Sequence, residues 1–371
     1  MADLNQFKQI PMFFLGANAP GGFVSAFPKA YDPTDGWRVF IIKGGPGTGK
    51  STLMKRAAQL LTAKDAHVFL SPCTGDPWSL DAVTAETQKI MILDGTAPHV
   101  VEPSCPGVCE SLVDLGSCWD GAALREKGRE ILAVSRENKL LHERASRYIS
   151  AAGSLLKDST HIAAACTDLE RAARFGQALA RKLIPAASRT GAGDGREIVR
   201  FLSGITPRGL VFFRETLETY CEHLVILSDD YGAASGAILE AVRTAALAAG
   251  WDIIACPCPF APEERLEHVL IPELSLGFTT ESRFLKLKRD DRRIHARRFT
   301  DLPALRLKKQ RLTFNRRAAR ELLQGAAELL AEAKTVHDAL EKYYIAAMDF
   351  DKVNKMTDTV LAELADLPDL R

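Results

Sequence analysis

Two periodicities of apolar residues divide the chain. Short apolar runs, typical of buried strands, lie within residues 38–94 and return within residues 223–281. Apolar residues at helical spacings of three, four and seven follow each region, at 124–155 and at 322–364. The pattern predicts an α/β protein in which two sheet-containing cores alternate with two helical arms.

The changes of pattern also set the expected boundaries. We expect a first core at 1–120, a helical arm at 121–184, a linker at 185–199, a second core at 200–300 and a second arm at 301–371. Within the first arm, a second helix is expected from about Ile162 to Leu183. The glycines Gly191, Gly193 and Gly195 are typical of a flexible linker. The arms either pack as hairpins on the cores or on each other, or form a moving lid or the seam of a homo-oligomer.

A glycine-rich segment lies between a strand and a helix of the first core. It fits G-x-x-x-x-G-K-[ST] in full and comprises Gly44, Gly45, Pro46, Gly47, Thr48, Gly49, Lys50 and Ser51, followed by Thr52. Glycine permits the backbone angles that turn successive N–H groups toward phosphate oxygens. The helix that starts near Lys50 directs the positive end of its dipole at the same anion. The segment therefore predicts a site for a nucleoside triphosphate.

Two side chains of this motif are expected to carry its charge and metal chemistry. Lys50 is expected to reach the β- and γ-phosphates, and Ser51 is expected to place its hydroxyl on Mg²⁺. The segment resembles the P-loop NTPase superfamily. The resemblance implies a parallel sheet flanked by helices, with ATP and Mg²⁺ bound at the carboxyl ends of the strands.

A carboxylate for the metal ion is expected at the end of a neighbouring strand. Asp94 follows four apolar residues and is the candidate, so Ser51 and Asp94 are the expected metal ligands. Lys50 and Asp94 are the expected catalytic residues. Asp81 is the alternative ligand, although it could instead cap a helix over residues 82–87.

The sequence offers three candidates for the group that activates water. Gly95 follows Asp94, where many hydrolytic ATPases carry glutamate. Glu86, Asp76 and His99 could replace it, and His99 could equally be a structural hydrogen-bonding residue. The Leu-Asp-Gly turn also resembles that of nucleoside monophosphate kinases, but their following Pro-Arg pair is replaced here by Thr-Ala-Pro-His.

The chain repeats itself at a separation of about 185 residues, which predicts two related cores. Strands and turns match in order, and the matched pairs are residues 14–22 with 202–209, 40–42 with 225–227, 68–74 with 253–259, 80–83 with 266–269 and 90–96 with 275–281. The tandem arrangement resembles a bacterial family of two-P-loop ATPases over nearly the whole chain. That resemblance implies the fold and the nucleotide but says little about a substrate.

The second copy of the loop is expected to be degenerate. In the alignment, Ser235 replaces Lys50, Gly236 replaces Ser51 and Thr279 replaces Asp94. Two aspartates, Asp229 and Asp230, stand at the loop entrance, where negative charge repels a triphosphate. We therefore expect one active and one degenerate nucleotide site in the chain.

Composition narrows the class of protein further. The 371 residues are 46% hydrophobic and 26% charged, with a net charge of +1, which argues against a disordered chain and against a protein that is basic all over. The chain shows neither a signal peptide nor a membrane-spanning run, so a cytoplasmic protein is expected. Eight cysteines are too sparse for a disulfide scaffold, and the pairs at 105/109 and 256/258 lack the spacing of a zinc site.

One stretch departs from the balanced charge. Residues 283–320 contain 15 lysines and arginines but only three acidic residues. The stretch could be a solvated face paired with acidic helices, a patch for nucleic acid or another polyanion, or the source of an arginine that reaches the γ-phosphate at Lys50.

Three functions are compatible with these features. The leading hypothesis is a Mg²⁺-dependent ATP hydrolase with one active P-loop domain, in which hydrolysis moves the helical arms. The alternatives are a nucleotide or small-molecule kinase, and a nucleotide-gated binding protein with negligible turnover. The sequence names neither an acceptor nor a partner.

Overall fold

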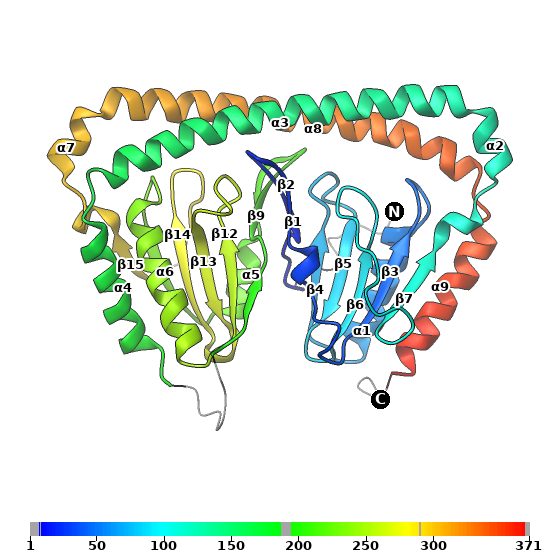
Figure 1. The fold of residues 1–371 in the computed structure, drawn as a ribbon, viewed down its shortest axis with the longest axis horizontal. Coiled ribbons are helices and arrows are strands. Elements are labelled where there is room, and N and C mark those ends of the chain that lie inside the picture. The colour runs from blue at the N-terminus through cyan, green and yellow to red at the C-terminus, as the bar shows by residue number, and fades with distance from the viewer. Residues whose placement is uncertain (1–6, 8, 187–193, 289–290, 368–371) are drawn as a thin grey trace.

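The computed structural model describes residue 7 and residues 9–186, 194–288 and 291–367. These residues form two α/β cores that stand side by side, and two long helices cross above both of them (Figure 1). The α/β fold class expected from the sequence is confirmed.

The first core contains a sheet whose described strands follow the order β4-β5-β6-β3-β7. Their bounds are Val68–Pro72 (β4), Leu80–Ala85 (β5), Ile90–Asp94 (β6), Arg38–Lys43 (β3) and Glu110–Asp114 (β7). The second core contains a sheet with the order β15-β11-β14-β13-β12-β8. Its strands are Arg292–His295 (β15), His223–Ser228 (β11), Leu276–Glu281 (β14), Leu266–Ile271 (β13), Ile253–Pro257 (β12) and Glu197–Val199 (β8).

Both sheets are mixed, so the expectation of parallel sheets was wrong. In the first sheet β5 runs antiparallel to β4 and to β6, whereas β3 is parallel to β6 and to β7. In the second sheet β13 is the reversed strand between β12 and β14. The reason is local: only short turns separate β4, β5 and β6, and such turns join antiparallel strands, whereas parallel neighbours need a longer crossover.

The order β4-β5-β6-β3-β7 in the first sheet corresponds to the order β12-β13-β14-β11-β15 in the second sheet. The two sheets therefore have the same topology over these strands. A short antiparallel hairpin precedes the main strands in each half. The hairpins comprise Gly16–Ala19 (β1) with Gly22–Ser25 (β2), and Ser203–Thr206 (β9) with Gly209–Phe212 (β10). Every pair of segments matched in the sequence repeat lies in equivalent elements of the two halves.

Helices connect and cover the sheets. They are Lys50–Ala63 (α1), Gly121–Glu126 (α2), Gly128–Ala164 (α3), Leu169–Leu183 (α4), Arg214–Tyr220 (α5), Ala233–Ala248 (α6), Leu302–Leu307 (α7), Lys309–Ala346 (α8) and Phe350–Ala365 (α9). Short 3₁₀ turns lie at Phe27–Lys29, Leu115–Cys118, Pro272–Leu274 and Ala296–Arg298. No helix in the described part of the chain is both long enough and apolar enough to cross a membrane.

The arms cross between the cores. The helix α3 leaves the first core, pairs with α8, and leads to α4, which packs on α6 of the second core (Figure 1). The helix α8 returns in the opposite direction and leads to α9, which packs on α1 of the first core. Each core is thus completed by a helix from the arm of the other half of the described chain.

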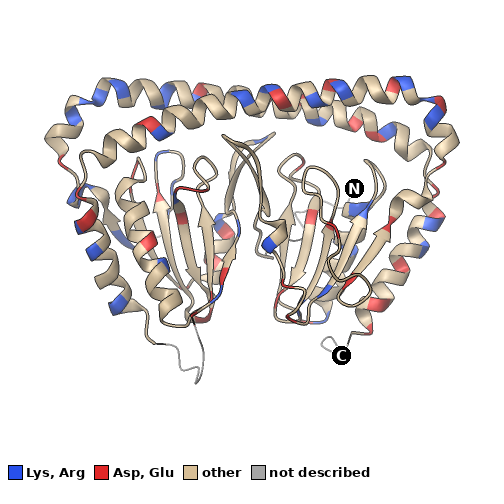
Figure 2. Cartoon of the chain, in the orientation of Figure 1, with Lys and Arg blue, Asp and Glu red and all other residues tan. Residues whose placement is uncertain are grey.

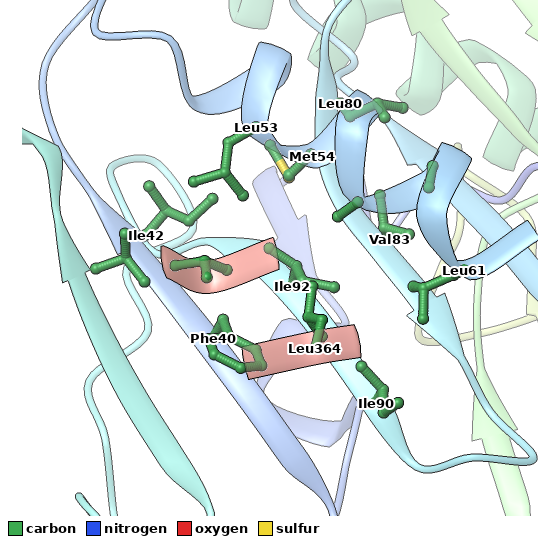
Figure 3. Close-up of a cluster of buried hydrophobic side chains, with 14 of the residues drawn as sticks. Phe40, Ile42, Leu53, Met54, Leu61, Leu80, Val83, Ile90, Ile92 and Leu364 are labelled. Atoms are coloured by element: carbon green, nitrogen blue, oxygen red, sulfur yellow. The ribbon is translucent and has the colours of Figure 1, made fainter. Parts of the chain in front are cut away.

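The core of the first half shows this exchange in its side chains. Leu53, Met54 and Leu61 of α1 pack on Phe40 and Ile92 of the sheet, and Leu364 of α9 enters the same cluster (Figure 3). Leu364 is fully buried. The hydrophobic effect therefore attaches α9 to the first core, at roughly 2 kcal/mol for each large apolar side chain buried.

The two cores also contact each other directly. Phe14 and Phe201 bond each other in an isolated antiparallel bridge, with N···O distances of 2.8 and 2.9 Å. Beside them Arg200 is fully buried, with its guanidinium 4.0 Å from the ring centroid of Phe69 and 3.4 Å from a carboxylate oxygen of Glu86. Residues of both halves thus share one interface.

Two expected boundaries need correction. The helix α3 continues to Ala164, and the side chain of Asp168 caps α4, so the second arm helix starts at Leu169 and not near Ile162. Residues 197–199 form β8 of the second sheet and are not part of a linker. The glycines at 191 and 193 lie outside the described residues.

Candidate functional site

The glycine-rich loop joins the carboxyl end of β3 to the start of α1, as the motif requires. Gly47 and Gly49 adopt left-handed backbone conformations, with φ values of 68° and 90°. These angles strain any residue with a Cβ, which accounts for glycine at both positions. Gly49 directly precedes α1, so the unpaired N–H groups of the first helical turn face the loop.

Lys50 is the first residue of α1, and its amine points back into the loop. It donates hydrogen bonds to the carbonyl oxygens of Gly44 and Gly45, both at 2.8 Å. It also lies 3.7 Å from Oδ2 of Asp94. The parallel pairing of Ile42 with Asp94 places the strand end next to the loop. The structure thus brings together the two residues expected to be catalytic.

Asp94 is oriented by the turn that follows it. Its Oδ1 accepts hydrogen bonds from the backbone N–H of Thr96 at 2.9 Å and from the Thr96 hydroxyl at 2.6 Å. This Asx-type turn leaves Oδ2 directed toward Lys50. The carboxylate therefore presents one oxygen to the loop.

The three hydroxyl residues of the motif, Thr48, Ser51 and Thr52, differ in their hydrogen-bond partners and exposure. The Ser51 hydroxyl accepts a hydrogen bond from the backbone N–H of Leu80 at 3.1 Å, which leaves its remaining lone pair for a cation. The Thr48 hydroxyl donates to the carbonyl of Gly45 at 2.9 Å and stabilises the loop. Thr52 is exposed on α1. Pro46 lies within the loop, between Gly45 and Gly47.

These groups suit a magnesium ion. Mg²⁺ takes oxygen ligands, usually one or two carboxylates with water and phosphate oxygens. Ser51 and Asp94 would hold such an ion, because each retains an oxygen lone pair that the protein's own bonds do not use.

Asp81 does not cap a helix. It lies in β5, the strand Leu80–Ala85, which pairs with β4 and with β6. Its Oδ1 is 3.4 Å from Nε2 of His99, while Nδ1 of His99 lies 2.9 Å from the carbonyl oxygen of Asp94. Both imidazole nitrogens are therefore engaged.

Both ring nitrogens of His99 have partners within the protein, which favours a structural role over that of a base for water. Its ring is buried and stacks on Phe27 with a centroid distance of 4.4 Å. Burial alone would lower the pKa of His99, but the carboxylate of Asp81 outweighs burial and raises it. The residue links the ends of β5 and β6.

The other two candidates for the base are also placed by the structure. Glu86 follows β5 at the opposite end of the strands from Asp94, where it pairs with Arg200. That position rules out direct contact with a phosphate at the loop. Asp76 lies in the turn between β4 and β5, and its Oδ2 accepts a hydrogen bond from the Ser79 hydroxyl at 3.0 Å.

The second loop is shorter than the alignment suggested, which corrects the assignment of its residues. Gly232 has a φ of 76° and directly precedes α6, so it corresponds to Gly49. Ala233 and Ala234 therefore stand where the first loop has Lys50 and Ser51, and the expected replacements Ser235 and Gly236 were wrong. The physical reason is that the connection from β11 is two residues shorter and α6 is two residues longer than α1.

The strand register gives a second correction. In the first core Ile42 pairs with Asp94, and in the second core Leu227 pairs with Thr280. Thr280, and not Thr279, therefore occupies the position of Asp94. At the corresponding positions the second core lacks the amine of Lys50, the hydroxyl of Ser51 and the carboxylate of Asp94.

Two charged side chains of the protein fill the second loop. The carboxylate of Asp229 accepts hydrogen bonds from the backbone N–H groups of Tyr231 at 3.0 Å and Ser235 at 2.9 Å. Arg265 donates to the carbonyl of Tyr231 at 2.9 Å and lies against Gly232. An internal carboxylate thus engages one N–H group of the second loop and one in the first turn of α6.

The open space beside the first loop is larger than the cavity at the second loop. An open recess of about 550 Å³ lies beside the first loop, bordered by Gly44, Gly95 and Trp119. The cavity at the second loop measures about 70 Å³ and is bordered by Tyr231 and Arg265. Only a few water molecules fit into the second cavity.

The sequence did not reveal that α8 covers the first loop. A Cβ on Gly45 would lie 3.2 Å from ring atoms of both Trp119 and Tyr344, and one on Gly47 would lie 2.8 Å from Ile345. Helical periodicity shows which face of α8 is apolar but not which core that face reaches.

The basic stretch, residues 283–320, belongs to the second half of the chain. Figure 1 shows β15 at the outer edge of the second sheet, away from the first core, so its arginines are not placed at Lys50. Several side chains of the basic stretch have acidic partners within the chain, including Arg283 with Asp230 and Arg293 with Glu281. Basic and acidic residues are interspersed along both long helices (Figure 2).

The cysteines are free thiols throughout the described residues. Burial raises the pKa of the Cys258 thiol to about 12. The chain matches no protein-family model, no curated protein and no solved structure.

Proposed function

We propose that this protein is a Mg²⁺-dependent ATP-binding protein and ATP hydrolase with one nucleotide site per chain. The observation that carries the proposal is the approach of Lys50 to Asp94, at 3.7 Å, where a glycine-rich loop opens a helix. A cation for the phosphates and a carboxylate for the metal are the two charges that phosphoryl transfer requires at such a loop.

The roles of the residues follow from this geometry. The loop N–H groups and Lys50 bind the β- and γ-phosphates, while Ser51 and Asp94 hold Mg²⁺ between them. The bound metal would neutralise the charge that develops on the phosphate oxygens. Lys50 must leave the carbonyls of Gly44 and Gly45 to contact a phosphate.

The two-domain interpretation rests on the shared topology of the sheets. We interpret both halves as P-loop NTPase-like cores, of which the second has lost its site. Asp229 and Arg265 support this interpretation, because they replace ligand contacts by contacts within the chain.

A kinase is the second candidate. The recess of about 550 Å³ between Gly44 and Gly95 has room for a phosphate acceptor beside the loop. The absence of glutamate after Asp94 is also compatible with transfer to an acceptor, or with slow turnover.

One experiment tests these alternatives together. The purified protein is incubated with Mg-ATP, labelled at the γ-phosphate, with and without a mixture of small metabolites. Release of free phosphate in the absence of metabolites supports the hydrolase, and a labelled metabolite supports the kinase. Tight binding without either product contradicts both enzymatic proposals.

A further inference from the structure

One face of α8 lies along the first loop. Ile345 and the backbone carbonyl of Glu341 approach Gly47, with distances of 2.8 and 3.1 Å to a Cβ placed there. Lys334 and Asp338 lie on the same face of α8, seven and three residues before Glu341. The second half of the chain therefore packs against the first loop, and the same face of α8 carries the cation Lys334.

Lys334 contacts the segment that positions the expected metal ligand. Its amine lies 3.4 Å from Oδ2 of Asp76, and the same oxygen accepts a hydrogen bond from Ser79 at 3.0 Å. The residue after Ser79 is Leu80, whose N–H donates to the Ser51 hydroxyl at 3.1 Å. A short chain of contacts thus leads from Lys334 to Ser51.

The charge of Lys334 is secured by its surroundings. The side chain is only 26% exposed. Burial lowers the pKa of Lys334, but the hydrogen bond to Asp338 and the charge of Asp76 outweigh burial and raise it. Lys43, which ends β3 at the start of the loop, is committed to the carbonyls of Gly95 and Val101.

We propose that Lys334 is a second phosphate-binding cation of the nucleotide site, supplied by the arm of the other half. It contacts the terminal phosphate of a bound nucleoside triphosphate. This inference rests on the proposed function. Without nucleotide, Asp76 and Asp338 hold the amine. A terminal phosphate carries more negative charge than either carboxylate and can replace one of them as the partner.

The test compares two nucleotides. Wild type and Lys334→Met are titrated with Mg-ADP and with Mg²⁺ plus a non-hydrolysable ATP analogue. The variant keeps the aliphatic stem and loses the charge. Because one charge-assisted hydrogen bond is removed, the affinity for the analogue is expected to fall roughly 10- to 100-fold, with the affinity for ADP retained.

Two further variants separate phosphate binding from a structural ion pair. Lys334→Arg keeps the charge and should retain the preference for the analogue over ADP. Lys342→Ala, at an exposed position of the same helix, should leave both affinities unchanged. An equal loss of both affinities in Lys334→Met, or no loss, would overturn the inference while leaving the proposed function intact. A wild-type protein that binds neither nucleotide would overturn the proposed function itself.

Discussion

Gly49 and Gly232 occupy the same place in the two halves of the chain. Each has a left-handed φ, 90° and 76° respectively, and each directly precedes a long helix on its sheet. The connections that lead to them differ, because the first spans residues 44–49 and the second only 229–232. The shorter connection lacks the residues that would curl around a phosphate, and Asp229 occupies its N–H groups.

Lys50→Ala should remove nucleotide binding and leave the fold largely intact, because the lysine side chain bonds only the loop and Asp94 among the described residues. With ligand at about 100 times its dissociation constant, binding stabilises the wild type by about 2.7 kcal/mol. A thermal-shift assay with Mg-ATP measures this difference. If the variant gains as much stability as the wild type, the site lies elsewhere.

Asp94→Asn should remove the dependence of nucleotide affinity on Mg²⁺. The amide preserves the shape of the side chain but lacks the charge that attracts the ion. Titrations with and without Mg²⁺ measure the effect. Asp81→Asn is the matched control and should retain the metal effect, because His99 faces that carboxylate. The opposite result would make Asp81 the metal ligand.

Glu86→Ala should lower the free energy of unfolding by about 2–3 kcal/mol, because it leaves the buried guanidinium of Arg200 without a carboxylate. This figure lies below the roughly 3–5 kcal/mol for breaking a fully buried pair, since Glu86 is 27% exposed. Adding Arg200→Met should recover most of the loss. Urea denaturation measures both effects.

The same variant tests whether Glu86 has a catalytic role. Glu86 lies at the opposite end of the strands from Asp94, so any hydrolysis should continue at the wild-type rate in Glu86→Ala. Loss of turnover in a folded Glu86→Ala protein would return Glu86 to the list of catalytic bases.

His268→Gln should reduce the sensitivity of the protein to mild acid. Burial lowers the pKa of His268 to about 4, so the folded state holds this ring neutral while the unfolded chain protonates it near its ordinary value of 6.5. The stability associated with the neutral ring is present above pH 6.5 and is lost as the pH falls toward 4. At pH 5 the loss is about 2 kcal/mol.

Denaturation of wild type and variant at pH 7.5 and pH 5 measures the difference between them. The glutamine retains a polar group for Thr279, whose hydroxyl lies 2.6 Å from the histidine ring. An equal loss of stability in both proteins on acidification would show that His268 does not carry the effect.

The sequence predicted the elements of this fold better than their arrangement. Glycine chemistry and β-branched runs locate the first loop and its strands, because both signals are local. The reversal of β5 was missed, since aspartate is a favoured helix cap and is uncommon in strands, and Asp81 nevertheless lies in a strand. The packing of α4 on the second core and of α9 on the first was also not predicted, because periodicity gives the apolar face of a helix and not its partner.

The candidate site also contains residues that the sequence predicted and one that it did not. Lys50, Ser51 and Asp94 follow from a motif and a strand end, and the structure brings Lys50 and Asp94 together. Lys334 carries no local signal, because it lies 284 positions after Lys50 in a helix rich in charged residues. Only the return of α8 to the first core makes it a neighbour of Asp76.

The number of nucleotides bound by one chain tests the account most directly. Calorimetric titration of the wild type with Mg²⁺ and a non-hydrolysable ATP analogue should give a ratio near one. Lys50→Ala should give a ratio near zero, because Ala233, Ala234 and Thr280 offer neither a cation nor a metal ligand at the second loop. A wild-type ratio near two, or a site that survives in Lys50→Ala, would contradict the proposal of one active and one degenerate loop.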